Sequence, residues 1–235
     1  MRIDFVTLFP ETVLTAVRAS ILGRAEARGI VAFGAINPRD FATDAHKTVD
    51  DAPYGGGPGM VMKPDVVAEA IRAVQSPGAT FVYPDPAGRK FEQAAAARLS
   101  SASHLVFVCG HYEGIDERVM EAFPGERLSV GDFVVTGGEW PAVLMADAVV
   151  RLLPDVLGCQ DSLAEDAFSD GLLTYPQYTR PEVWEDRAVP EVLLSGDHGR
   201  IRAWRRLMRL SATRERRPDL FARAPLSKSD LKLLE

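Results

Sequence analysis

Residues 104–119 carry the sequence HLVFVCGHYEGIDERV, in which an apolar run gives way to glycines and polar residues. The run from His104 to Cys109 predicts a buried β-strand. Gly110 and Gly114 bracket a turn, and a helix is expected to begin near Ile115. This strand, turn and helix form one βα unit, which is the building block of α/β folds.

The same alternation continues in both directions along the chain. Strands are predicted at residues 2–9, 80–83 and 133–136, and helices at 10–29, 91–99 and 139–153, with a further helix from Pro64. Pro10 and Pro64 suit first helical turns, and Gly29 is a plausible helix stop. The alternation predicts an α/β domain with a mainly parallel sheet, and such sheets bind ligands at the carboxyl ends of their strands.

The character of the chain changes after Leu157. Residues 158–172 are polar and rich in aspartate, which predicts a flexible interdomain linker. The remainder is mainly helical, with Ser195 or Asp197 as the cap of a helix that runs to about Arg209. We therefore expect a domain at 1–157, a linker at 158–172 and a small helical domain at 173–235.

Charge is distributed unevenly between these parts. Residues 1–172 hold 14 Lys/Arg and 24 Asp/Glu, a net charge of −10, whereas residues 173–235 hold 13 and 9, a net charge of +4. The acidic whole argues against nucleic acid as a partner and the basic C-terminal part argues for it, so composition leaves this question open.

Composition excludes several classes of protein. Only two cysteines, Cys109 and Cys159, are present, so no disulfide framework is expected. The N-terminus lacks the apolar region of a secretory signal, and no run approaches the ~18–20 apolar residues of a membrane span. We expect a cytoplasmic protein that does not act at a membrane.

Cys109 and His111 raise the possibility of a nucleophile with its base, or of a metal site. No partner that would orient His111 is evident from the sequence, and the four histidines form no metal-spaced cluster. Cys109 at the end of an apolar strand is more typical of a small core residue. We predict no fixed metal site, and Glu113 is the polar residue best placed at this strand end.

Glycine or proline marks three loops, at residues 83–88, 110–114 and 137–138, which could flank one small-molecule pocket. YGGGPGM (54–60) matches neither a dinucleotide-binding nor a P-loop pattern. It is either a flexible surface loop or a backbone that approaches a ligand or partner closely. Arg151 could simply face the surface. Asp161, Glu165, Asp166 and Asp170 lie in the linker, where one carboxylate over a pocket would suit a general base.

Seven blocks follow one another along the chain: FVTLFPE (5–11), HKTVDDAPYGGGPGM (46–60), CGHYEGIDERV (109–119), SVGDFVVTGGE (129–139), AEDAFSDGLL (164–173), PQYTRPEVW (176–184) and VPEVLLSGDHGRI (189–201). In these blocks and their spacing the chain resembles, over nearly its whole length, the bacterial tRNA (guanine-N1)-methyltransferases of the TrmD type, in the SPOUT superfamily.

The resemblance implies a deep trefoil knot in the α/β domain, one of the rare exceptions to unknotted topology. It also implies S-adenosyl-L-methionine (AdoMet) as methyl donor, a homodimer whose active sites are shared between chains, and guanosine 37 of tRNA, just 3′ of the anticodon, as the target. Mg²⁺ dependence is associated with the family. The AdoMet-binding residues implied are Tyr83, Pro86, Gly110, Tyr112, Glu113, Val130, Gly131, Asp132, Phe133, Val134, Val135, Gly137, Gly138 and Pro141.

The resemblance assigns the catalytic roles to Asp166, Arg151 and Glu113. Asp166 would be the base, Arg151 would stabilise charge on guanine O6, and Glu113 would help to hold the base or the methionine end of AdoMet. The family often has tyrosine at Phe133 and serine at Ala167, but neither change removes a group that the chemistry requires. A methyltransferase for another RNA position, an inactive RNA-binding protein and a Rossmann-type enzyme are the alternatives.

Overall fold

The computed structural model describes residues 1–158 and 166–234. The chain divides into two compact units, Met1–Gly158 and Cys159–Glu235, with the boundary at the start of the predicted linker. Each unit is described by itself. Cys159, Asp161 and Glu165, which the sequence analysis singled out, lie outside the described residues.

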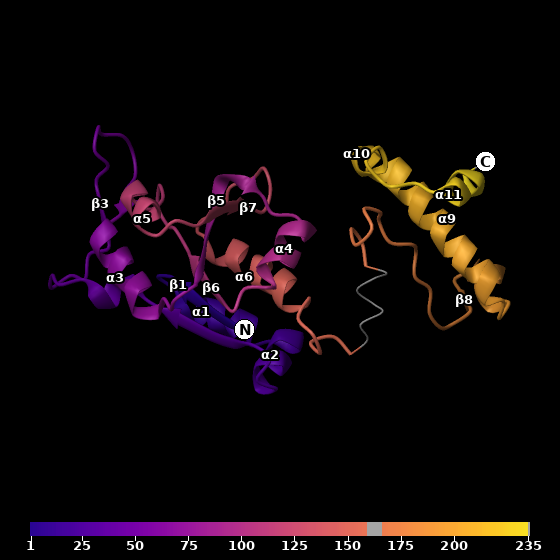
Figure 1. Cartoon of the computed structure of the whole chain (residues 1–235), viewed down its shortest axis with the longest axis horizontal. Helices are drawn as coiled ribbons and strands as arrows, with labels where there is room; N and C mark the ends of the chain where they lie inside the picture. The colour runs from indigo at the N-terminus through magenta and orange to yellow at the C-terminus, as the bar shows by residue number, and fades with distance from the viewer. Residues whose placement is uncertain (159–165, 235) are drawn as a thin grey trace. The chain divides into compact units, whose positions relative to one another are not determined.

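The first unit is built on a five-stranded sheet (Figure 1). Its strands are β1 (Arg2–Val6), β2 (Ala32–Ile36), β5 (Thr80–Lys90), β6 (His104–Val108) and β7 (Glu126–Ser129), in the order β2-β1-β6-β5-β7. Every pairing in this sheet is parallel, which confirms the predicted α/β fold with a mainly parallel sheet. All of β6 is buried, as its apolar run requires.

Helices cover both faces of the sheet. They are α1 (Pro10–Val17), α2 (Ser20–Ala27), α3 (Pro64–Val74), α4 (Gln93–Leu99), α5 (Glu117–Ala122) and α6 (Glu139–Val150). Phe5 and Phe107 stack 5.5 Å apart in the core shared with α1 and α6. Val106 and Val108 belong to the other core, beneath α3 and α5. The alternation along β6 therefore supplies two cores from one strand.

Several predicted elements have other bounds. Residues 133–136, predicted as a strand, form bends and loop instead, and Phe133, Val134 and Val135 are exposed. The strand lies earlier, at β7, whose sequence ERLS has little apolar character. The helix predicted at 10–29 is two helices, because the chain turns at Ser20, where φ is +51°. Two short strands, β3 (Asp50–Asp51) and β4 (Val61–Met62), flank the glycine-rich loop.

The second unit consists mainly of helices around α9 (His198–Arg216). Among its described residues, the other elements are the hairpin β8 (Val183–Trp184) and β9 (Arg187–Ala188), and the helices α8 (Glu191–Leu194), α10 (Pro218–Phe221) and α11 (Lys228–Leu233). Asp197 caps α9 by accepting the backbone N–H groups of Gly199 and Arg200 at 2.9 and 3.0 Å. The helix continues beyond the predicted end at Arg209.

The chain segment that precedes this unit's hairpin is fixed to α9. Asp170 accepts hydrogen bonds from Arg206 at 2.8 Å and from Arg209 at 2.6 and 3.1 Å. The N–H of Leu173 donates to Thr213 Oγ1 at 2.9 Å. Asp170, near the end of the predicted linker, and Leu173, just after it, are therefore held by the helix.

Candidate active site

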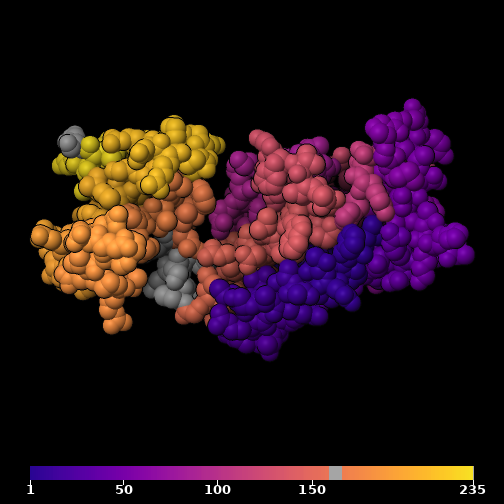
Figure 2. All heavy atoms as spheres, turned by 180° about the vertical axis from the view of Figure 1, so that it is seen from behind, coloured from indigo at the N-terminus to yellow at the C-terminus, as the bar shows by residue number. Residues whose placement is uncertain are grey.

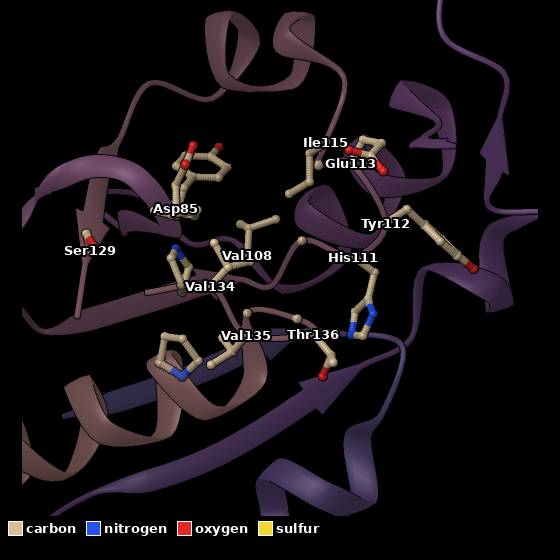
Figure 3. A pocket seen from close by; sticks show the side chains of 18 of the residues that line it. Asp85, Val108, His111, Tyr112, Glu113, Ile115, Ser129, Val134, Val135 and Thr136 are labelled. Carbon is tan, nitrogen blue, oxygen red and sulfur yellow. The ribbon is translucent and has the colours of Figure 1, made fainter. Parts of the chain in front are cut away.

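A cavity of about 300 Å³ lies where β6 ends, and we call it the β6 cavity (Figure 3). Most of its lining comes from three chain segments: residues 83–86 of β5, the turn 110–115 after β6, and residues within 129–138 from the end of β7 onward. Asp85, Val108 and Val134 border the space in Figure 3, whereas the Tyr112 side chain extends away from it. The position matches the rule that parallel sheets present ligand sites at the carboxyl ends of strands.

Most of the residues expected to bind AdoMet come together in this cavity. Its lining includes Tyr83, Pro86, Gly110, Tyr112, Glu113, Val130, Phe133, Val134, Val135, Gly137, Gly138 and Pro141. Gly131 and Asp132 lie between the lining residues Val130 and Phe133 without lining the cavity themselves. The residues 130–138, which we call the cavity loop, thus supply the largest share of the wall.

Glycines allow the cavity loop to pack against the end of β6. The N–H of Gly138 donates to the carbonyl of Gly110 at 2.9 Å, and Gly137 forms a bridge with His111. A Cβ on Gly138 would lie 2.9 Å from Cys109 Cα, and one on Gly137 would collide with the His111 ring. Side chains at these positions would push the loop off the strand end.

Cys109 belongs to the core. Its side chain is buried among the residues packed under α6, so the prediction of a core residue is confirmed, although β6 ends one residue earlier, at Val108. Burial raises the pKa of the Cys109 thiol well above its ordinary value, and the nearby Glu139 carboxylate raises it further. A thiol held protonated in this way is unsuited to nucleophilic attack.

His111 does have an orienting partner, contrary to the sequence analysis. Its Nε2 lies 2.8 Å from Glu139 Oε2, and Glu139 Oε1 accepts a hydrogen bond from Thr7 Oγ1 at 2.6 Å. Glu139 is buried at the first residue of α6, and Thr7 follows β1. These three side chains, which we call the Thr7–Glu139–His111 chain, join three elements behind the cavity loop. Spacing could not reveal the chain, because its members come from distant parts of the sequence.

Glu113 lines the cavity next to the glycine-rich loop. Its N–H donates to the carbonyl of Met60 at 2.9 Å, and a Cβ on Gly59 would overlap the Glu113 carboxylate. Gly59 also has a φ of +83°, which side chains rarely adopt. Gly59 therefore approaches Glu113 of the same chain closely, whereas a Cβ on Gly55, Gly56 or Gly57 would meet nothing within 4 Å. Close approach of this loop to a ligand or partner stays a prediction.

Residues 83–86 contribute an apolar wall and one carboxylate. The Tyr83 hydroxyl donates to the carbonyl of Phe123 at 2.7 Å, and burial raises the pKa of Tyr83. This hydroxyl is therefore directed into the core. Asp85 lines the cavity and accepts the N–H of Ala87 at 2.8 Å. The sequence analysis did not single out Asp85, because it predicted only a proline-marked turn there.

Comparison with known proteins settles the family. Residues 1–223 match the family model described as tRNA (Guanine-1)-methyltransferase TrmD. The chain belongs to this family. Relatives named tRNA (guanine-N(1)-)-methyltransferase include one from Magnetococcus marinus, 50% identical over 240 residues that cover 100% of this chain and 95% of the relative. Another, from Chloroflexus aggregans, is 52% identical over 241 residues that cover 100% of this chain and 94% of the relative.

The three candidate catalytic residues of this TrmD-family chain lie in different elements. Glu113 lines the β6 cavity. Arg151 follows the last residue of α6, where its N–H donates to the carbonyl of Asp147 at 3.1 Å. Asp166 belongs to the second unit, and its carbonyl accepts hydrogen bonds from the N–H and the hydroxyl of Ser169. Asp166 is thus the first residue of a tight turn that leads to Asp170.

Two properties of the described residues bear on metals and membranes. They contain no group of three or more histidine, cysteine, aspartate or glutamate side chains placed to hold a metal ion. None of the helices they form has the length and apolar character needed to cross a membrane.

Proposed function

We propose that the chain transfers a methyl group from AdoMet to N1 of guanosine 37 in tRNA, a modification that prevents frameshifting. The observation that carries the proposal is the glycine-walled β6 cavity at a parallel-strand end, in a chain of the TrmD family. Cytoplasmic tRNA is the substrate that fits such an enzyme.

The residues of the β6 cavity suit AdoMet. Val130, Val134 and Val135 offer an apolar surface for the adenine ring, and backbone groups of the cavity loop are available for its nitrogens. The Glu113 carboxylate suits the cationic methionine end of the ligand. When bound, AdoMet supplies a methyl group that its sulfonium has already activated for transfer.

The protein must make guanine N1 a nucleophile. N1 of neutral guanine carries a proton, so we assign its removal to the Asp166 carboxylate, a role typically worth ~10²–10⁴-fold in rate. The negative charge that develops on O6 requires a fixed cation, and we assign Arg151 to it.

The protein is further proposed to act as a homodimer with active sites shared between chains. Exposed apolar side chains support this assembly: Phe9 is 51%, Trp140 55% and Leu144 59% exposed. Leu144 also lines a groove between α6 and residues 16–22 at the junction of α1 and α2. Figure 2 shows the indigo N-terminal residues beside a rose surface of the first unit. Apolar surface of this kind is typical of protein interfaces.

Mixed dimers test the shared site. Asp166→Ala should abolish turnover and leave AdoMet affinity nearly unchanged, whereas Gly138→Trp should block the cavity. If each site draws on both chains, dimers that combine the two variants should recover part of the activity. Recovery no greater than the sum of the separate variants would contradict a shared site.

The second unit is proposed to bind tRNA. Its net charge of +4 over residues 173–235 and the exposed Arg200, Arg202 and Arg214 on α9 suit phosphate contacts. Such contacts predict affinity that falls steeply with salt. We also propose the SPOUT trefoil knot for the first unit. After β7 the chain comes back to the end of β6, where Gly138 bonds to Gly110 and Gly137 pairs with His111. This path of the chain supports the proposed knot.

The direct test of the reaction uses methyl-labelled AdoMet and an unmodified tRNA transcript. After digestion to nucleosides, we expect the label in 1-methylguanosine. Label in another methylated nucleoside, or no label, would contradict the proposed reaction.

A further inference from the structure

A second cavity, of about 360 Å³, lies within the second unit, and we call it the α9 cavity. Two of the sequence blocks that the proposed chemistry leaves unused meet there. PQYTRPEVW contributes Tyr178, and VPEVLLSGDHGRI contributes Leu193 and Ile201. Trp204 and Arg205 of α9 also line this cavity.

Aromatic rings form one side of the α9 cavity. The rings of Tyr178 and Trp204 lie 6.3 Å apart at an angle of 56°. Tyr178 is 48% exposed, so its ring is open to a ligand. Leu193 and Ile201 make the neighbouring surface apolar. Open aromatic faces beside apolar side chains suit a flat ring, and every nucleobase offers one.

Arg205 contributes a hydrogen-bond donor that has no acceptor among the described residues. Its guanidinium carbon lies 4.9 Å from the centre of the Tyr175 ring. Its Nε is buried and, among the described residues, makes no hydrogen bond. A buried donor without an acceptor is costly, so a ligand acceptor here would be favourable. By contrast, Arg206 and Arg209 on the same helix donate to Asp170.

We propose that the α9 cavity takes one unpaired nucleobase of the bound tRNA. The base would stack on Tyr178 or Trp204, and an acceptor on its edge would meet the guanidinium group of Arg205, which lines the cavity. The net positive charge of the second unit favours a polyanion such as RNA over an uncharged hydrophobic ligand. The inference rests on the proposed function, because it assumes that tRNA is the substrate, and it adds a contact with a base to the contacts with phosphates.

The test compares tRNA binding by Tyr178→Ala and Trp204→Ala with that of the wild type at one fixed salt concentration. Loss of a base–aromatic stack should weaken the Kd for tRNA roughly 5- to 100-fold. Tyr178→Phe and Trp204→Phe should retain most of the affinity. Trp184→Ala is the matched control, since Trp184 is an exposed aromatic of the same unit outside the cavity lining. AdoMet affinity should be unchanged in all variants.

Tyr178→Ala keeps the test valid if Trp204→Ala fails to fold, because Tyr178 is largely exposed. If both alanine variants bind tRNA as tightly as Trp184→Ala does, the proposal is overturned. If wild-type protein binds AdoMet but methylates no tRNA, the proposed function itself fails, which is a separate outcome.

Abasic tRNAs identify the base. Single unpaired nucleotides are replaced one at a time by abasic residues, and Kd is measured with wild type and with Tyr178→Ala. One abasic tRNA should bind the wild type more weakly and show no further loss with the variant. If Tyr178→Ala weakens the binding of every abasic tRNA equally, the α9 cavity holds no single base.

Discussion

His111 Nε2 lies 2.8 Å from Glu139 Oε2, and this contact joins the turn after β6 to the first residue of α6. The other Glu139 oxygen accepts the Thr7 hydroxyl at 2.6 Å, and Thr7 Oγ1 in turn accepts the N–H of Phe9 at 3.0 Å. The buried carboxylate therefore fixes the His111 ring against Gly137. Through this ring, the end of the first strand supports the cavity loop.

Replacement of Glu139 by alanine should weaken both the fold and AdoMet binding. The change leaves Thr7 and His111 without their shared acceptor, which should lower the free energy of unfolding by about 1–3 kcal/mol. Urea denaturation measures this loss, and calorimetry measures the weaker AdoMet affinity. Glu121→Ala, at an exposed glutamate of α5, is the control. Equal stability of the two variants would show that the Thr7–Glu139–His111 chain supports nothing.

Gly138→Ala tests the close packing of the cavity loop. The added Cβ would lie 2.9 Å from Cys109 Cα and 3.0 Å from Gly110 N, and backbone atoms have little room to adjust. We expect AdoMet affinity to fall on the order of 10-fold or more, since overpacking typically costs ~1–3 kcal/mol. Gly158→Ala is the control, because its Cβ would meet no described atom within 4 Å. Unchanged AdoMet affinity in Gly138→Ala would mean that AdoMet binding does not require the cavity loop to pack against the end of β6.

Cys109→Ser should separate stability from chemistry. A buried hydroxyl in this apolar setting should lower the free energy of unfolding by about 1–3 kcal/mol. Methyl transfer by the folded variant should continue, because the thiol takes no part in it. A folded Cys109→Ser protein with no activity would restore the cysteine as a candidate nucleophile.

Stability of the second unit should depend on pH through Asp170. Burial opposes ionisation of this carboxyl, but hydrogen bonds from Arg206 and Arg209 outweigh it and lower the pKa of Asp170. A lowered folded-state pKa stabilises the fold above the ordinary value of 3.8, and this stabilisation is lost as the pH falls through the lowered pKa. Thermal unfolding followed by tryptophan fluorescence should therefore show a falling midpoint below about pH 4.

Asp170→Asn isolates that contribution. At neutral pH it should cost on the order of 1 kcal/mol, because the pair is partly solvated. It should also reduce the fall in midpoint at acidic pH without removing it, since Arg206 also holds the Asp230 carboxylate, whose pKa is lowered as well. The same acid response in the variant and the wild type would assign the pH dependence to other carboxyls.

The sequence predicts the core of the first unit well and its edges poorly. His104–Val108 is recognisable because a strand buried on both faces is apolar without interruption. Residues 133–136 have a similar apolar composition, yet they line a cavity, so the strand prediction there is wrong. Strand β7 was missed because ERLS carries little hydrophobic pattern.

The glycine-marked loops of the site were foreseeable, but their supports were not. Gly137 and Gly138 indicate that the backbone packs closely against another segment. Nothing in the local sequence indicates that Glu139 contacts His111 and Thr7. The same holds for Asp170, whose partners Arg206 and Arg209 lie 36 and 39 residues further along the chain. Contacts of this kind depend on the fold and leave no periodic signal.

The central claim is methylation of the guanosine that follows the anticodon. The measurement that tests it most directly uses two unmodified tRNA transcripts that differ only in having G or A at position 37, with methyl-labelled AdoMet. The account predicts label in the G transcript alone, recovered as 1-methylguanosine. Equal labelling of both transcripts, or of neither, would contradict it.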